Sequence, residues 1–251
     1  MTFSHAVIIV TVGFIAGMVN TIVGSGTLLT FPTLLALGYH AVIANVSNTI
    51  GLITGYLTGA IGYRRELEGQ ARRILVLLPG AIAGTIIGAV LLLALPGSAF
   101  RHVVPFLILL AVVLVVAQPR IAKWRADRGG IREHPGVLLQ SGTFLTSIYG
   151  GYFGAAQSVI LLGLFGITID DDLRRLNAAK TVVSGVISTA AAVFFAFTTT
   201  IAWQVVGLMV IGSTIGGQVG AVIGRRLSPQ VLRAAIAVVG TVAAIRLLVT
   251  S

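Results

Sequence analysis

Long apolar runs separated by short polar connections occupy almost the whole chain. Most of these runs approach the ~20 residues that a helix needs to cross a hydrocarbon core of about 30 Å. They cover residues 6–23, 27–38, 41–62, 74–95, 101–118, 137–153, 157–168, 177–199, 202–224 and 230–249. Runs 27–38 and 157–168 are too short for a straight span, so we expect them to be broken, re-entrant or steeply tilted. The pattern predicts an all-α integral membrane protein with about ten transmembrane or half-membrane helices.

The composition agrees with a membrane protein. Hydrophobic residues make up 56% of the chain and charged residues 10%, whereas a soluble domain carries about 25% charged residues. Glycine occurs 31 times, and in a membrane bundle small residues allow helix backbones to approach closely. The chain has no cysteine, which excludes disulfides, thiolate metal sites and thiol redox chemistry.

The net charge of +10 would suggest nucleic-acid binding in a soluble protein. Here the basic residues gather in the short connections between apolar runs, which is typical of cytoplasmic loops. The four clusters are Arg64 to Arg73, residues 120–132, Arg174 with Arg175, and Arg225 with Arg226. If all four face the cytoplasm, the runs alternate correctly and both termini lie outside. We therefore expect a multi-pass protein of the inner (plasma) membrane with no nucleic-acid partner.

The two halves of the chain align with each other. A shift of 132 residues places Asn45 on Asn177, Thr49 on Thr181, and Gly80, Gly84 and Gly88 on Gly212, Gly216 and Gly220; a shift of 130 places Gly24 on Gly154. Each half has five runs, so the second half enters the membrane from the opposite side. The sequence thus predicts inverted repeats over residues 1–118 and 137–251, joined by a basic cytoplasmic linker over 119–136. Such repeats are typical of transporters that bind substrate near the midplane.

A small, polar stretch precedes each short run. The candidate binding residues in these stretches are Gly24, Ser25, Gly26, Thr27, Gly154 and Gln157. Glycine allows the backbone to leave the helical conformation, and the helix that follows presents free N–H groups and the positive end of its dipole. Those groups suit an anion. Close helix packing through glycine is the alternative interpretation.

A second pair of polar motifs follows the short runs. Asn45 and Asn48 lie on one helix face, as do Asn177 and Lys180. The repeat aligns Asn48 with Lys180, so an amide in one half matches a cation in the other. A lysine within the bilayer is expensive and is usually functional. Alternatively, Lys180 lies near the cytoplasmic helix end and extends toward water.

Acidic side chains are absent from every apolar run. They fall in predicted loops, at Glu66, Glu68, Asp127, Glu133, Asp170, Asp171 and Asp172. A carboxylate proton relay or carboxylate cation cage therefore has no residues to build it. No metal-ligand cluster and no Ser/His/Asp set occurs. We expect no catalytic residue, no metal site and no cofactor, and an interior suited to an anionic or polar neutral solute.

Taken together, these motifs resemble the sulfite exporter TauE/SafE family of membrane permeases. The resemblance covers nearly the whole chain and rests on Gly24 to Gly26 with Pro32, Ala44 to Asn48, Gly150 to Gly154, Arg175 to Lys180, Gly216 to Gly220, and Arg225 to Pro229. The chain departs from the family in its short Gly24-Ser25-Gly26 stretch and in Ala155-Ala156, where another glycine is usual. Those departures alter the backbone that would touch the substrate.

The resemblance implies a permease, often an exporter, for sulfite or a small organic sulfur anion bound near the midplane between the repeats. Its expected partners are a small anionic solute and the lipid bilayer. Two other classes stay open: a permease for a small neutral metabolite, and a non-transporting membrane assembly factor. The sequence does not set the coupling ion, the direction of transport or the oligomeric state, for which a homodimer is one option.

Overall fold

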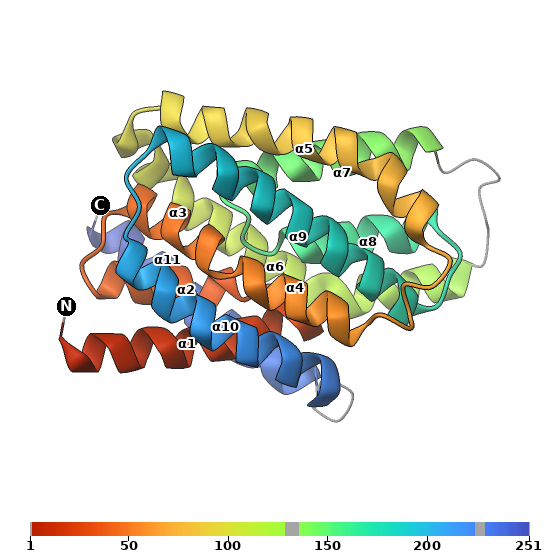
Figure 1. The fold of residues 1–251 in the computed structure, drawn as a ribbon, viewed down its shortest axis with the longest axis horizontal. Coiled ribbons are helices and arrows are strands. Elements are labelled where there is room, and N and C mark those ends of the chain that lie inside the picture. Colours follow the sequence, from red (N-terminus) through yellow and green to blue (C-terminus); the bar gives the residue numbers. More distant parts are fainter. Residues whose placement is uncertain (1, 129–135, 224–228, 251) are drawn as a thin grey trace.

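The computed structural model describes residues 2–128, 136–223 and 229–250, and these residues form helices without a strand. The helices are α1 (Phe3–Ile22), α2 (Thr27–Ala36), α3 (Ala41–Gly51), α4 (Ile53–Gly62), α5 (Ala71–Ala94), α6 (Gly97–Arg128), α7 (Gly136–Tyr152), α8 (Gln157–Thr168), α9 (Leu173–Thr198), α10 (Trp203–Ile223) and α11 (Pro229–Thr250). They lie roughly side by side along the long axis of the molecule (Figure 1).

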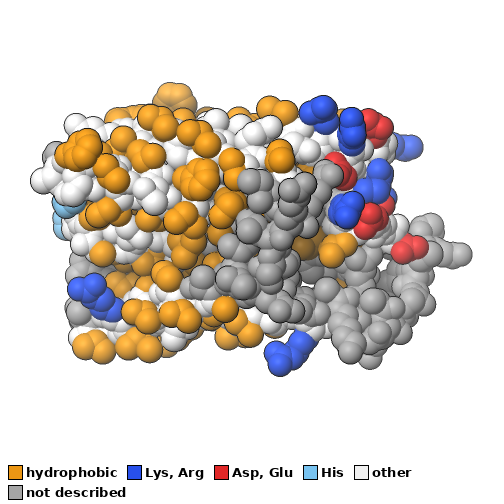
Figure 2. Space-filling model, turned by 90° about the horizontal axis from the view of Figure 1, so that it is seen from below, with side chains coloured by type: hydrophobic (Ala, Val, Ile, Leu, Met, Phe, Trp, Pro, Cys, Tyr) orange, Lys and Arg blue, Asp and Glu red, His pale blue; other side chains and the backbone are white. Residues whose placement is uncertain are grey.

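The helices have the length and the surface of a membrane bundle. Among the described residues, four segments are long and apolar enough to span a membrane: α1, α5, α9 and Trp203–Val222 of α10. Hydrophobic side chains cover much of the flank drawn in Figure 2, whereas most of the charged side chains visible there gather at one end. The prediction of an all-α integral membrane protein is confirmed.

The two ends of the bundle differ in charge. Both termini lie at one end, and the α4–α5 and α8–α9 connections lie at the other, which we call the basic end (Figure 1). Arg64, Arg72 and Arg174 are exposed there. Arg132, Arg225 and Arg226, which belong to the other two predicted clusters, lie outside the described residues.

Several boundaries differ from those predicted. The run 41–62 consists of two helices, α3 and α4, that meet at Leu52. Helix α6 begins at Gly97 and continues through residue 128, so the first part of the predicted linker 119–136 is helical and not a loop. Helices α2 and α8 have 10 and 12 residues, about 15–18 Å of helix, so each is long enough for about half of a hydrocarbon core.

Helix contacts in one half recur in the other at the two sequence shifts of the repeat, 132 and 130 residues. Helix α1 packs along α10, and α7 packs along α5, in both cases with glycine backbone directly against a carbonyl group. The corresponding contacts are Gly84 with Phe144 and Gly216 with Phe14, then Gly88 with Ile148 and Gly220 with Met18. Glycine lets these backbones touch, because a Cβ at Gly88 would lie 1.9 Å from the Ile148 oxygen. The first helix of each half therefore packs on a late helix of the other half.

Candidate functional site

The first break in the helical backbone covers residues 23–26, between α1 and α2. Gly24 has a φ of 96°, which L side chains rarely adopt. The Gly26 N–H donates to Asn20 Oδ1 at 2.6 Å. A Cβ at Gly26 would lie 2.4 Å from the Ala16 carbonyl oxygen, so α2 starts folded back against α1. Its first residue therefore lies inside the bundle.

The second break covers residues 153–156, between α7 and α8. Helix α7 continues to Tyr152, and a Cβ at Gly151 would lie 2.0 Å from the Thr85 carbonyl oxygen. Gly151 therefore allows α7 to pack closely on α5. Gly154 has a φ of 75° and Ala156 a φ of 57°. The left-handed region favours glycine, so the alanine at 156 stores strain of order 1 kcal/mol.

The first break touches the start of α8, directly after the second break, in the interior. A Cβ at Gly24 would lie 2.5 Å from the Cβ of Ser158, the second residue of α8. From this point α2 runs toward the end with the termini, and α8 runs to the basic end, where Asp171 pairs with Arg73 of α5. Neither helix start has a side-chain cap. The positive ends of two helix dipoles therefore lie in the same region.

Lys180 lies at this meeting point. Its side chain is 0% exposed, and Nζ donates to the Asn20 carbonyl oxygen at 3.4 Å. A Cβ at Gly24 would lie 3.2 Å from Nζ. The side chain thus points into the bundle and does not extend to the basic end. It forms no ion pair with a carboxylate in the described part of the chain.

Two asparagines related by the repeat fasten the breaks to neighbouring helices. Asn45 Nδ2 on α3 donates to the Tyr152 carbonyl oxygen at 3.1 Å, and Asn177 Nδ2 on α9 donates to the Thr21 carbonyl oxygen at 3.2 Å. A carbonyl oxygen accepts only from the NH₂ side of an amide, which fixes both orientations. The Oδ1 atoms of both side chains are buried and have no hydrogen-bond partner among the described residues.

Asn48 has a different environment from Lys180, its counterpart in the repeat. Its Nδ2 donates to Thr27 Oγ1 at 3.3 Å, and its Oδ1 accepts from Thr30 Oγ1. Both threonines lie in the first turn of α2. Asn48 therefore holds the start of α2 against α3.

Buried polar atoms without a partner are concentrated at the breaks. They are Asn20 Nδ2, Ser25 Oγ, Asn45 Oδ1, Gln157 Oε1 and Asn177 Oδ1; one more among the described residues, Thr143 Oγ1, lies almost three helical turns before the second break. Native proteins leave very few such groups unsatisfied, and each one calls for an explanation. Five of them at or beside the two breaks indicate a site for a polar ligand.

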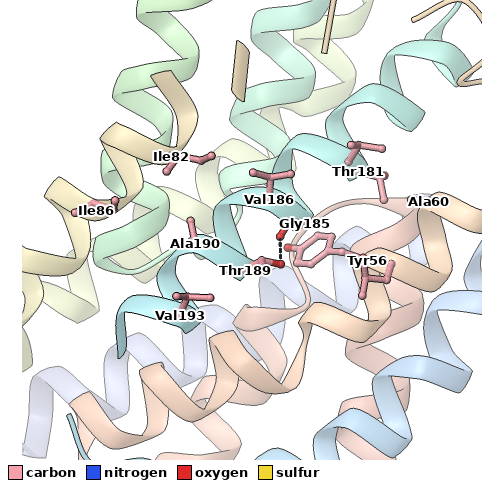
Figure 3. Close-up of a pocket in the computed structure, with 12 residues that line it drawn as sticks. Tyr56, Ala60, Ile82, Ile86, Thr181, Gly185, Val186, Thr189, Ala190 and Val193 are labelled. Atoms are coloured by element: carbon pink, nitrogen blue, oxygen red, sulfur yellow. Dashed lines mark hydrogen bonds between the residues drawn. The ribbon is translucent and has the colours of Figure 1, made fainter. Parts of the chain in front are cut away.

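The cavity beside the second break is small. A cavity of about 10 Å³ is lined by Thr27, Thr49, Leu52, Tyr56, Gly150, Phe153, Gly154, Gln157 and Ser188. That volume is about the room that one water needs, so this conformation is closed to a larger solute. Tyr56 also lines a wider, apolar groove of about 440 Å³ between α4, α5 and α9 (Figure 3). It separates the polar cavity from the groove.

The structure brings the predicted residues of the two halves together. Gly24, Ser25 and Gly26 form the first break and Gly154 the second, while Thr27 and Gln157 begin the two half-helices. Asn45, Asn48, Asn177 and Lys180 reach the breaks from α3 and α9. Sequence reasoning missed Asn20, Tyr56, and the Ser158–Ser184 pair, whose hydroxyls lie 2.7 Å apart. Asn20 could have been recognised from the sequence, because it is an amide inside an apolar run. Nothing in the sequence marks the other three residues.

Comparison with known proteins assigns the chain to a family. The model of the sulfite exporter TauE/SafE family matches residues 9–247. The chain belongs to this family. Relatives of the TauE/SafE chain include a "Probable membrane transporter protein" of Haemophilus influenzae, 26% identical over 84% of this chain and 81% of that protein.

Two further relatives have similar names. A "Probable membrane transporter protein ORF9" of Sinorhizobium sp is 25% identical over 94% of this chain and 89% of that protein. The "Probable membrane transporter protein YfcA" of Escherichia coli K12 is 22% identical over 96% and 88%. No solved structure matches the TauE/SafE chain significantly. Membership of the family shows that the protein is a membrane transporter. The class of its solute is inferred below from the site.

Proposed function

We propose that this TauE/SafE protein exports sulfite or a small organic sulfur anion across the inner membrane, with the anion bound between the two breaks. The observation that carries the proposal is the fully buried Lys180 beside the starts of α2 and α8, with no ion pair to any described residue. An anion that enters a low-dielectric site loses its hydration and needs fixed positive charge in exchange. A lysine ammonium and two helix N-termini supply that charge.

The hydrogen-bond donors at the site support an oxyanion. Asn20 Nδ2 and the Ser25 hydroxyl have no partner in the described part of the chain, so both are free to donate to a bound oxygen. The ammonium of Lys180 is a compact point charge, which suits an oxyanion without imposing one bidentate geometry. Sulfite and small sulfonates present several acceptor oxygens in a small volume, so they fit this set of donors.

We further propose that residues 1–118 and 137–251 move as inverted repeats about this site. The paired contacts of Gly84 and Gly216 support the symmetry, and the closed cavity supports a moving mechanism, because a bound solute needs more room. Rocking of one repeat against the other would open the breaks to each side in turn. The linker 119–136 would then lie in the cytoplasm and both termini outside.

Replacing Lys180 with methionine tests the proposed counter-charge. Lys180→Met keeps most of the side-chain volume and removes the ammonium. We expect the Kd for sulfite, measured by calorimetry on purified protein, to rise about 10- to 150-fold, which corresponds to the ~1.5–3 kcal/mol of a hydrogen bond to a charged group. Arg72→Met, which removes an exposed charge at the basic end, should leave the Kd unchanged. An unaltered Kd in folded Lys180→Met protein would reject the assignment.

A further inference from the structure

The two breaks differ in one position that the repeat makes equivalent. At the first break, Lys180 Nζ reaches the Asn20 carbonyl oxygen near the carboxyl end of α1. In the other half of the repeat, the counterpart of Lys180 is Asn48, which is shorter and bonds to Thr27 and Thr30 of α2. The carboxyl end of α7 therefore has no tethered ammonium from this position.

The cavity of about 10 Å³ lies at this second break. Gly150, Phe153 and Gly154, at the end of α7, form part of its lining. The carboxyl end of a helix carries partial negative charge from its free carbonyl groups. Thr27, which accepts from Asn48, also lines the cavity, so the cavity adjoins the counterpart of Lys180 as well as a negative helix end.

Oxygen acceptors are available at this cavity. Gln157 lines it, is 2% exposed, and has an Oε1 without a partner. Asn45 lies one turn before Thr49, which also lines the cavity, and its buried Oδ1 is unpaired as well. The hydrogen bond that Asn45 Nδ2 donates to the Tyr152 carbonyl oxygen fixes the orientation of the side-chain amide, so its Oδ1 can only accept. These groups require a donor or a cation.

The ligand set favours a monovalent cation. Within the described residues, no group of three or more His, Cys, Asp or Glu side chains occurs, so a transition metal has no ligands there. Divalent hard cations are bound mainly through carboxylates, and none lines the cavity. Neutral carbonyl and hydroxyl oxygens next to a helix carboxyl end are typical of Na⁺ sites in transporters with broken helices.

We propose that a monovalent cation of the size of Na⁺ binds at the second break, in the place equivalent to that of the Lys180 ammonium at the first. Gln157 Oε1, Asn45 Oδ1 and the carboxyl end of α7 provide its oxygen ligands. One positive charge would then lie at each break. Coupling of this cation to anion transport rests on the proposed function, whereas the cation site itself does not.

Thermal unfolding of the purified protein tests the site without any transport assay. We expect NaCl at about ten times its Kd to raise the Tm by about 3–6 °C relative to choline chloride at equal ionic strength. Gln157→Glu adds a carboxylate and should lower the apparent Kd for Na⁺ at least tenfold at pH 7. Thr143→Val, which removes a buried unpaired hydroxyl away from the breaks, should keep the wild-type response.

Asn48→Lys is the second, symmetry-based variant. A tethered ammonium at position 48 should take the place of the cation, so this variant should lose the Na⁺-dependent rise in Tm. If it does not fold, Gln157→Glu decides alone. The absence of a Na⁺-specific shift in both wild type and Gln157→Glu would overturn the proposal and leave a water in the cavity.

Sulfite binding in choline chloride separates this proposal from the proposed function. Sulfite binding with no effect of Na⁺ on the Tm would reject the cation site and retain the anion site. A Na⁺ shift that Asn48→Lys abolishes, without any sulfite binding, would retain the cation site and reject the anion site.

Discussion

Gly88 and Gly80 lie on the same helix, α5, yet they have different roles. A Cβ at Gly88 would lie 1.9 Å from the Ile148 carbonyl oxygen of α7, whereas a Cβ at Gly80 meets no described atom within 4 Å. Gly88→Ala should therefore lower the free energy of unfolding by about 1–3 kcal/mol through overpacking. Gly80→Ala should be neutral or stabilise by up to about 1 kcal/mol. Thermal unfolding in detergent checks both, and equal Tm values would contradict the packing account.

At the residue scale the repeat alignment was the strongest source of information. It identified Asn45, Asn177 and Lys180 because equivalent positions of two repeats converge when the halves pack together. It could not decide where Lys180 points, since nearness in sequence to Arg174 and Arg175 also suits a side chain that extends to water. Lys180 lies about two turns inside α9, which begins at Leu173, and this depth was visible only once the helix start was known.

At the element scale, run lengths predicted the two half-helices well. Run 157–168 coincides with α8, and run 27–38 exceeds α2 by two residues. Hydropathy could not reveal the division at Leu52, because both α3 and α4 are apolar and helical on either side of it. Hydropathy also predicted too early an end for α6, at residue 118. Backbone hydrogen bonds continue a helix beyond the apolar run, whatever the polarity of its side chains.

Asp171 connects two helices at the basic end, and its carboxylate gives a testable pH dependence. It accepts from Arg73 of α5 at 2.9 Å and from Arg175 of α9 at 2.8 Å. Partial desolvation acts to raise the pKa of this carboxyl, but hydrogen bonds from Arg73 and the Asp172 N–H and the charges of both arginines lower it below its usual value of 3.8. Because the pKa is lower in the folded state than in the unfolded state, the ionised Asp171 carboxylate stabilises the folded protein at pH values above its folded-state pKa.

Replacing Asp171 with asparagine should therefore destabilise the protein at neutral pH by about 1 kcal/mol, the upper range for partly exposed pairs. The contribution is complete above pH ~4, the unfolded value, and is lost as the pH falls through the lower pKa of the folded state. Thermal unfolding of both proteins between pH 3 and 7 measures it. A difference that does not shrink toward pH 3 would contradict the role of the ionised carboxylate.

At the scale of the whole molecule, the termini and the basic connections occupy opposite ends (Figure 1). The cysteine-free chain allows single-cysteine labelling at each end. We expect a membrane-impermeant maleimide to label Phe3→Cys, which replaces a side chain 86% exposed at the terminal end, in intact cells. Glu68→Cys, at the basic end, should react only after the cells are opened. The reverse result would invert the proposed orientation.

The central claim is that the site between the breaks carries a small sulfur oxyanion across the bilayer. Uptake of radiolabelled sulfite into proteoliposomes tests it most directly. Wild-type protein should give saturable uptake above that of protein-free liposomes, and Lys180→Met should reduce the rate at subsaturating sulfite at least tenfold, in line with its weaker binding. Wild-type uptake no faster than that of protein-free liposomes, or full uptake by Lys180→Met, would contradict this account.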